Sequence, residues 1–89
     1  MPLVRIPTPL RSHTGGQESV EGAGATVGAV LEAVVTTHPE LRTRLFEDGE
    51  VRRFVNVYVN NEDIRYLEDL ATPVAEKDEI SIIPAIAGG

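Results

Sequence analysis

The chain has 89 residues, enough for one small domain with a modest hydrophobic core. Hydrophobic residues make up 42% of it and charged residues 25%, which is typical of a folded globular protein and argues against general disorder. The net charge of −6 has the wrong sign for neutralising phosphates, which argues against a nucleic-acid partner. There is no cysteine, which excludes disulfides, thiolate nucleophiles and cysteine-based metal sites.

The excess of acidic residues lies entirely in the second half of the chain, from Leu45 onward. Two interpretations are open: a solvated acidic face that keeps a small protein soluble, or a surface that docks to basic partners. No apolar stretch is long enough to span a membrane, and the first residues lack the apolar region of a signal peptide. We therefore expect no membrane partner and a cytoplasmic location.

The first elements in chain order are those of a hairpin. Residues 3–10 are apolar and β-branched, and they predict a short strand that stops or turns outward at Pro7 and Pro9, because proline cannot donate to a ladder. Residues 13–17, His-Thr-Gly-Gly-Gln, have the composition of a turn. Residues 18–21 then predict a second strand that pairs with the first.

The next element is the main helix. Thr26 is a suitable N-cap after the glycine-rich residues 22–25. Four apolar residues follow at helical spacing, namely Val27, Val30, Leu31 and Val34. The helix should end by His38, because Pro39 disfavours helical geometry in the residue before it. Leu41 and Leu45, one turn apart, predict a short second helix before a turn at residues 47–50.

The remaining strands lie in the second half. Residues 51–59 predict one strand with a fully aliphatic face, because Val55, Val57 and Val59 alternate with Phe54, Asn56 and Tyr58. Asn60 and Asn61 predict a tight turn into a partner strand over residues 62–66. After an irregular segment and a charged turn at 76–79, residues 80–83 predict the last strand. The order ββαββ indicates a two-layer α+β domain with a mixed sheet on one main helix.

The chain ends in an uncharged tail, residues 84–89, of sequence Pro-Ala-Ile-Ala-Gly-Gly. Terminal segments are usually polar and frayed, whereas this one stays apolar to its last residue. Gly88 and Gly89 lack a Cβ, so the terminal carboxylate would stand on a thin stalk that fits a narrow cleft. We therefore expect a single domain over residues 1–89 whose flexible tail, residues 84–89, is a functional part.

Several of these stretches together resemble the ubiquitin-like sulfur carriers of the ThiS and MoaD family, which have a β-grasp fold. Residues 54–60, Phe-Val-Asn-Val-Tyr-Val-Asn, are similar to that family's central strand and turn, and residues 78–89 to its acidic turn, last strand and tail. Within the family, residues 6–8, 10–11, 13–17 and 60–65 are most similar to CysO-type carriers. Ala85 departs from many molybdopterin-type carriers, which have a second proline there.

The resemblance implies the chemistry of the tail. A terminal carboxylate is ionised and unreactive at neutral pH, so it must be activated first. An E1-like partner would adenylate Gly89, with ATP and magnesium bound by that partner, and sulfide or a persulfide would then displace AMP. Gly88, Ala87 and Ile86 would thread into partner enzymes. The resulting thiocarboxylate is itself the nucleophile, so the chain would be a protein co-substrate and not an enzyme.

The resemblance to CysO-type carriers also implies an acceptor. A pyridoxal-phosphate-dependent cysteine synthase would take the sulfur, and a peptidase of the JAMM metallopeptidase type would release the product. The chain itself would bind no cofactor, because the pyridoxal phosphate belongs to the synthase. A related sulfur-containing metabolite is the other possible product. Two alternative functions stay open: the MoaD-like small subunit of molybdopterin synthase, and a ubiquitin-like modifier conjugated to lysines.

The other candidate residues have simpler interpretations. Phe54, Asn56 and Tyr58 are expected to face away from the core as a partner-docking surface. Two histidines are too few for a metal site, so surface or turn roles are expected for His13 and His38. The glycines at 22, 24 and 28 resemble a phosphate loop in spacing but lack its Gly-Lys pair, which favours turn formation and helix packing. The arginine pairs at 42 and 44 and at 52 and 53 are expected to be solvated.

Overall fold

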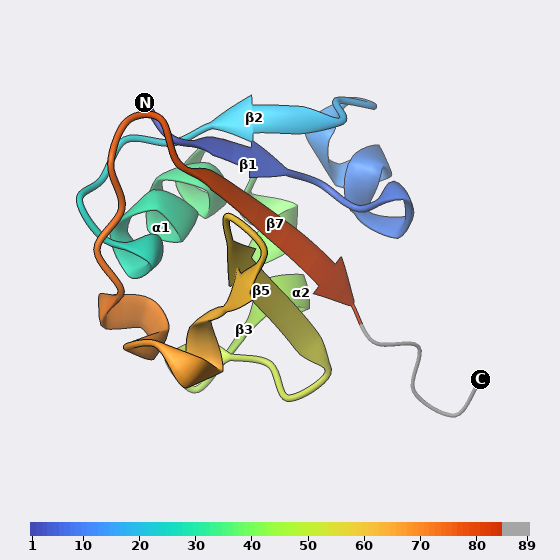
Figure 1. Ribbon diagram of the computed structural model, residues 1–89. Coiled ribbons are helices and arrows are strands. Elements are labelled where there is room, and N and C mark those ends of the chain that lie inside the picture. Colours follow the sequence, from blue (N-terminus) through green and yellow to red (C-terminus); the bar gives the residue numbers. More distant parts are fainter. Residues whose placement is uncertain (85–89) are drawn as a thin grey trace.

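The computed structural model describes residues 1–84, and Ala85 to Gly89 lie outside the described residues. Its centre is a five-stranded sheet in the order β2-β1-β7-β5-β6 (Figure 1). The strands are β1 (Leu3–Arg5), β2 (Ser19–Glu21), β5 (Val55–Val59), β6 (Glu62–Asp63) and β7 (Glu79–Pro84). β1 and β7 pair in parallel and the other neighbours pair antiparallel, so the sheet is mixed, as the sequence predicts.

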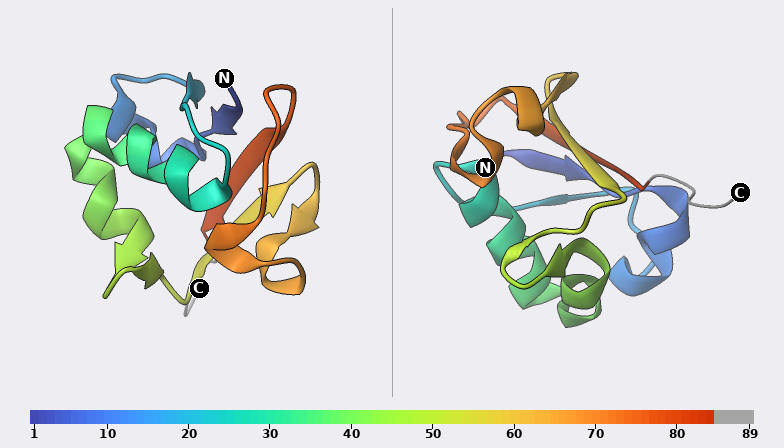
Figure 2. Two further views of the ribbon diagram at one scale, coloured as in Figure 1. Left: turned by 90° about the vertical axis from the view of Figure 1, so that its left-hand side faces the viewer. Right: turned by 90° about the horizontal axis from the view of Figure 1, so that it is seen from below.

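One long helix, α1 (Val27–Thr37), packs on the sheet. Figure 2 shows α1 and the short α2 (Arg42–Leu45) on the same side of it. Thr26 caps α1 as predicted, with its Oγ1 accepting the N–H of Ala29 at 3.2 Å. The helix also ends where predicted, at His38 and before Pro39.

The core lies between α1 and the inner face of the sheet. The helix contributes Val27, Val30, Leu31, Val34 and Val35, all of them buried. The sheet contributes Val4, Val20, Val55, Val57, Val59, Ile80 and Ile82. Both patterns follow from the sequence, because residues three or four apart share a helix face and alternate residues share a sheet face.

Short elements join these parts. They are the 3₁₀ helices η1 (Thr8–Thr14), η2 (Pro39–Leu41), η3 (Ile64–Tyr66) and η4 (Asp69–Ala71), and the small strands β3 (Phe46–Glu47) and β4 (Glu50–Val51). β1 ends at Arg5, before Pro7 and Pro9, as expected. The predicted turns are also present, because Gly15, Gly16, Asn60 and Asn61 all have positive φ.

Two predicted strands are shorter than the sequence indicates. The prediction of one strand over residues 51–59 is wrong, because Val51 pairs with Phe46 in a separate hairpin and β5 begins only at Val55. Between them the chain turns, and the N–H of Val55 donates to the carbonyl of Arg52 at 3.0 Å. The strand predicted over residues 62–66 pairs only at Glu62–Asp63 and continues as η3.

The glycines before and within α1 permit close packing, which confirms their structural interpretation. A Cβ on Gly22 would lie 2.7 Å from the carbonyl oxygen of Val30, and one on Gly24 would lie 2.7 Å from the Val30 nitrogen. A Cβ on Gly28 would meet the carbonyl oxygen of Leu70 at 3.0 Å. Within residues 1–84, no helix has the length and apolar character needed to cross a membrane.

Candidate functional site

The described chain ends at the carboxyl end of β7, a strand in the middle of the sheet. β7 pairs with β1 along Glu79–Ser81 and with β5 from Ile80 to Pro84. The last pair of the sheet joins Pro84 to Val55. The residue from which the tail continues is therefore fixed to a regular strand, which positions a functional segment better than a loop would.

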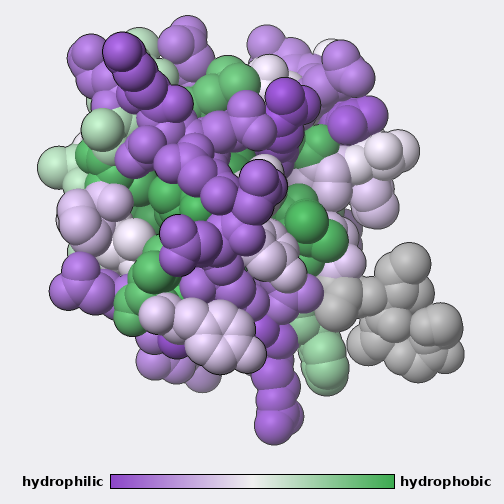
Figure 3. Space-filling view, viewed as in Figure 1, coloured by the Kyte–Doolittle hydropathy of each residue, from purple (hydrophilic) through white to green (hydrophobic). Residues whose placement is uncertain are grey.

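Exposed apolar side chains surround this point. Phe54 is 56% exposed and Ile83 is 50% exposed, and Ile83 lies opposite Asn56 in the β5–β7 ladder. We call Phe54, Asn56, Ile83 and Pro84 the tail base. Figure 3 shows hydrophobic surface beside the end of the described chain, and further hydrophobic patches lie among the hydrophilic side chains elsewhere on this face. Large apolar side chains that stay in water beside a functional segment are typical of a docking surface.

One arginine forms hydrogen bonds to the tail base and to the turn before it. The guanidinium of Arg65, on η3, donates to Asn56 Oδ1 at 2.8 Å. It also donates to the carbonyl oxygens of Arg53 and Val55, both at 3.0 Å. Arg65 thereby fixes the turn that carries Phe54 and the start of β5.

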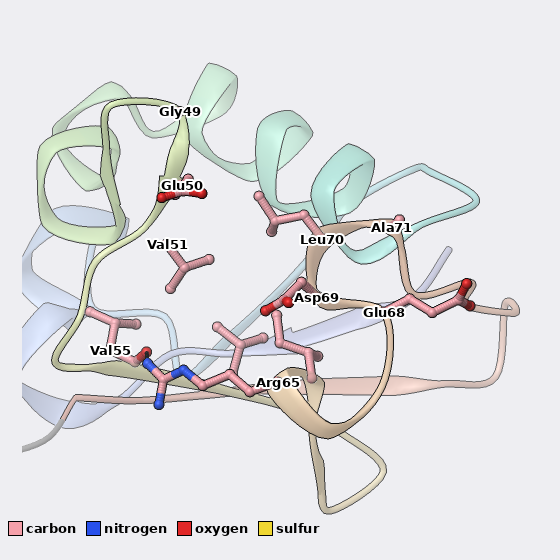
Figure 4. A pocket seen from close by; sticks show the side chains of 11 residues that line it. Gly49, Glu50, Val51, Val55, Arg65, Glu68, Asp69, Leu70 and Ala71 are labelled. Atoms are coloured by element: carbon pink, nitrogen blue, oxygen red, sulfur yellow. Dashed lines mark hydrogen bonds between the residues drawn. The ribbon is translucent and has the colours of Figure 1, made fainter.

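A cavity of about 460 Å³ lies beside Arg65 (Figure 4). Its lining includes the apolar side chains of Val51, Val55, Val57 and Leu70 and the carboxylates of Glu50, Glu68 and Asp69. The carboxylates disfavour phosphate, and Arg65 already donates to three oxygens. The lining of this cavity therefore disfavours an anionic ligand. That ATP and pyridoxal phosphate belong to partner enzymes stays a prediction.

The expected site residues fall into two groups. Gly89, Gly88, Ala87 and Ile86, which we expected to react or to thread into partners, lie outside the described residues. Phe54, Asn56 and Tyr58 do alternate with the buried valines of β5 and face away from the core, as predicted. Their use by a partner stays a prediction.

Sequence reasoning missed two residues of this region. The sequence does carry a signal for Ile83. Ile80 and Ile82 face the core from alternate positions of β7, so Ile83, one residue after Ile82, must point outward. The sequence gives no signal for Arg65, because a single arginine in a polar segment is ordinary surface composition.

His13 and Arg42 take simple structural roles. His13 Nδ1 lies 3.0 Å from Glu40 Oε2, which ties η1 to η2. Arg42 forms an exposed ion pair with Glu32 at 2.7 Å, and the hydrogen bond from its guanidinium lowers the pKa of that carboxyl. No cluster of three metal-binding side chains occurs among the residues that the structure describes.

Comparison with known proteins places this geometry in a family. A family model described as the ThiS family matches residues 4–89. The chain belongs to the ThiS family. The "Sulfur carrier protein CysO" of Mycobacterium tuberculosis is 47% identical over 89 residues, which cover 97% of this chain and 96% of the relative. The "Small archaeal modifier protein 3" of Haloferax volcanii is 42% identical over 65 residues, 73% of this chain and 71% of the relative.

A solved structure confirms the fold of this ThiS-family chain. The crystal structure of the Amycolatopsis orientalis BexX/CysO complex contains a chain with 45% identity and a TM-score of 0.94, with 100% of both chains covered. The predicted ubiquitin-like β-grasp fold is therefore correct. The resemblance to CysO-type carriers, inferred from stretches within residues 6–17 and from residues 60–65, is also confirmed.

Proposed function

We propose that this chain is a sulfur carrier that delivers sulfur as a thiocarboxylate on Gly89. The observation that carries the proposal is the 47% identity to a sulfur carrier protein over 97% of the chain. The tail base supports it, because a regular strand ends beside exposed apolar side chains at the point from which the tail continues. The chain provides a handle and a docking surface, and partner enzymes provide the catalysis.

The chemistry requires activation by a partner. An oxygen of the Gly89 carboxylate attacks the α-phosphate of ATP in an E1-like enzyme, which forms an acyl-adenylate and releases pyrophosphate. Hydrosulfide then attacks the carbonyl carbon, AMP leaves, and one proton is released as the thiocarboxylate forms. The magnesium and the phosphate-binding groups belong to the activating enzyme. Gly88, Ala87 and Ile86 occupy the narrow channel that leads to its active site.

The sulfur acceptor follows from the similarity to CysO. A pyridoxal-phosphate-dependent cysteine synthase is the proposed acceptor, and a JAMM-type metallopeptidase is the proposed enzyme that releases the amino acid. The solved complex of a CysO protein with BexX supports a carrier that docks on other proteins. We place the chain in the cytoplasm, where ATP and these enzymes are present.

Intact-mass spectrometry tests the proposal. The chain is incubated with an E1-like adenylating enzyme, ATP, magnesium and sulfide. Its mass should rise by the difference between one sulfur and one oxygen atom. A matched control chain carries one alanine after Gly89, which blocks the reactive end and leaves every described residue unchanged. An unchanged mass with an enzyme that loads other ThiS-family carriers would contradict the proposal.

A second candidate is a ubiquitin-like modifier, which the similarity to the small archaeal modifier protein favours. It predicts isopeptide-linked conjugates of the chain that persist on reducing gels. Lys77 is the one lysine of the sequence, so chains of the protein linked to itself would all join at this residue. A third candidate, the small subunit of molybdopterin synthase, predicts stable co-purification with a large catalytic subunit.

A further inference from the structure

The side-chain amide of Asn56 has a defined orientation. Arg65 Nη1 lies 2.8 Å from one end of this amide. A guanidinium has only donors, so the end that faces it must be the oxygen, and the Nδ2 group with its two hydrogens must face away. No buried side-chain nitrogen or oxygen in residues 1–84 lacks a partner, and no described group accepts from Nδ2. Nδ2 therefore reaches the surface as an available donor.

Arg65 is itself held in place, which prevents this amide from rotating freely. Its second nitrogen, Nη2, donates to the carbonyl oxygens of Arg53 and Val55. Its backbone N–H donates to Asp63 Oδ1 at 2.9 Å, the cap of η3. A flip of the Asn56 amide would place the NH₂ group against a cationic donor and lose a charge-assisted hydrogen bond. The donor face of Asn56 is thus fixed before any partner arrives.

The location of this donor matters because the remaining tail is short. Five residues follow Pro84, and even a fully extended chain of that length spans only roughly 17 Å. An enzyme that takes Gly89 into its active site must therefore bring its surface close to Pro84. Asn56 lies beside Ile83, one residue from Pro84, and Phe54 is exposed nearby. This surface offers apolar contact together with one oriented polar contact, the combination that gives an interface specificity.

We propose that Asn56 is a specificity-determining contact for the adenylating enzyme, in which its Nδ2 donates to a carbonyl or carboxylate oxygen of that enzyme, and that Arg65 is the residue that positions it. The inference rests on the proposed function, since it assumes that Gly89 is activated. It adds a recognition element on the folded domain, apart from the tail.

The substitution Asn56→Asp tests the donor directly. A carboxylate at position 56 still accepts from Arg65, so the turn and the strand keep their hydrogen bonds. It presents an oxygen where the amide presented NH₂, which sets acceptor against acceptor in the complex. The matched control is Asn61→Asp, which makes the same chemical change and charge change in the exposed turn at the other end of β5.

Adenylation is measured as ATP–pyrophosphate exchange with the E1-like enzyme, at varied concentrations of carrier. For Asn56→Asp we expect a KM for the carrier that is raised roughly tenfold or more, with kcat within about twofold of the wild type. Asn61→Asp should have the same KM and kcat as the wild type. A KM of Asn56→Asp within about twofold of the Asn61→Asp value overturns the inference.

The positioning role of Arg65 needs a double-mutant cycle. Arg65→Ala frees the amide to rotate, so it should raise the KM several-fold in the wild-type background and add nothing to Asn56→Asp. If Arg65→Ala raises the KM equally in the wild-type and Asn56→Asp backgrounds, Arg65 acts only on stability. That result overturns its role in positioning Asn56. If the wild-type chain is adenylated and Asn56→Asp leaves the KM for the carrier unchanged, this inference is refuted and the proposed function is not. A wild-type chain that is never adenylated refutes the proposed function and this inference with it.

Discussion

At the scale of single residues, Asp78 joins two turns at the end of the sheet opposite the tail base. Its Oδ2 accepts the N–H of Ala75 at 2.8 Å, and its Oδ1 accepts from Asn60 Nδ2 at 2.9 Å. Asn60 Oδ1 in turn accepts the N–H of Glu79 at 3.1 Å. The hydrogen bond from Ala75, followed by that from Asn60, lowers the pKa of the Asp78 carboxyl below its ordinary value of 3.8.

This shift predicts how stability depends on pH. Because the pKa is lower in the folded state, the ionised carboxylate stabilises the fold fully above 3.8, and this contribution is lost as the pH falls through the lowered pKa. Asp78→Ala should lower the midpoint of thermal unfolding at pH 7, and the gap to the wild type should shrink as the pH falls below the ordinary pKa. Glu76→Ala, with the same loss of charge in the same turn, is the control. A gap that is constant down to pH 2 would contradict this role.

At the scale of elements, the start of α1 gives a clear prediction. The Oγ1 of Thr26 satisfies the N–H of Ala29, one of the unpaired donors at the helix N-terminus. Thr26→Ala should lower the free energy of unfolding by about 1 kcal/mol, as measured by urea denaturation. Thr26→Ser keeps the hydroxyl and should recover most of the loss. Equal losses for the two variants would show that the methyl group and not the cap is responsible.

The elements that were predicted well are those with strong local signals. The helix has a capping threonine, a regular apolar spacing and a proline after its end, and its observed bounds follow them. The strand predicted over residues 51–59 failed because Val51 lies in the same alternating phase as the valines of β5, although Arg53 interrupts the apolar series within the turn at residues 52–54. β4 is a separate strand because Val51 pairs with Phe46 and not with the central sheet. Periodicity along the sequence cannot reveal this contact.

The candidate site was predictable to the same degree. The outward position of Asn56 and Tyr58 follows from strand alternation alone, whereas Phe54 is exposed in the turn before β5. The hydrogen bonds from Arg65 do not, because they depend on how η3 folds back beside β5. The oriented donor on Asn56 therefore appears only in three dimensions.

At the scale of the whole molecule, the order of strands places the tail. The sequence indicates the strands and the helix but not that β1 pairs in parallel with β7. This pairing places the first and last strands side by side and makes the last strand a central one (Figure 1). β1 and β5 hold the first half of β7 on both sides, and β5 alone continues to pair up to Pro84, so the residue before the tail lies in a regular strand.

The core of the described chain is built from residues that precede the tail. The buried apolar residues of the described chain run from Val4 to Ile82. Deletion of Gly88 and Gly89 should therefore change the free energy of unfolding by less than about 0.5 kcal/mol while it abolishes sulfur loading. Urea denaturation and intact-mass measurement on the same sample check both parts. A strongly destabilised deletion variant would show that the tail serves the fold.

The most direct test of the central claim is to locate the sulfur within the loaded chain. After incubation with the adenylating enzyme, ATP, magnesium and sulfide, the C-terminal peptide is isolated and fragmented in a mass spectrometer. We expect the added mass of sulfur over oxygen only in fragments that contain Gly89. Sulfur on any other residue, or an unmodified Gly89 in a chain that still supports sulfur transfer, would contradict the account.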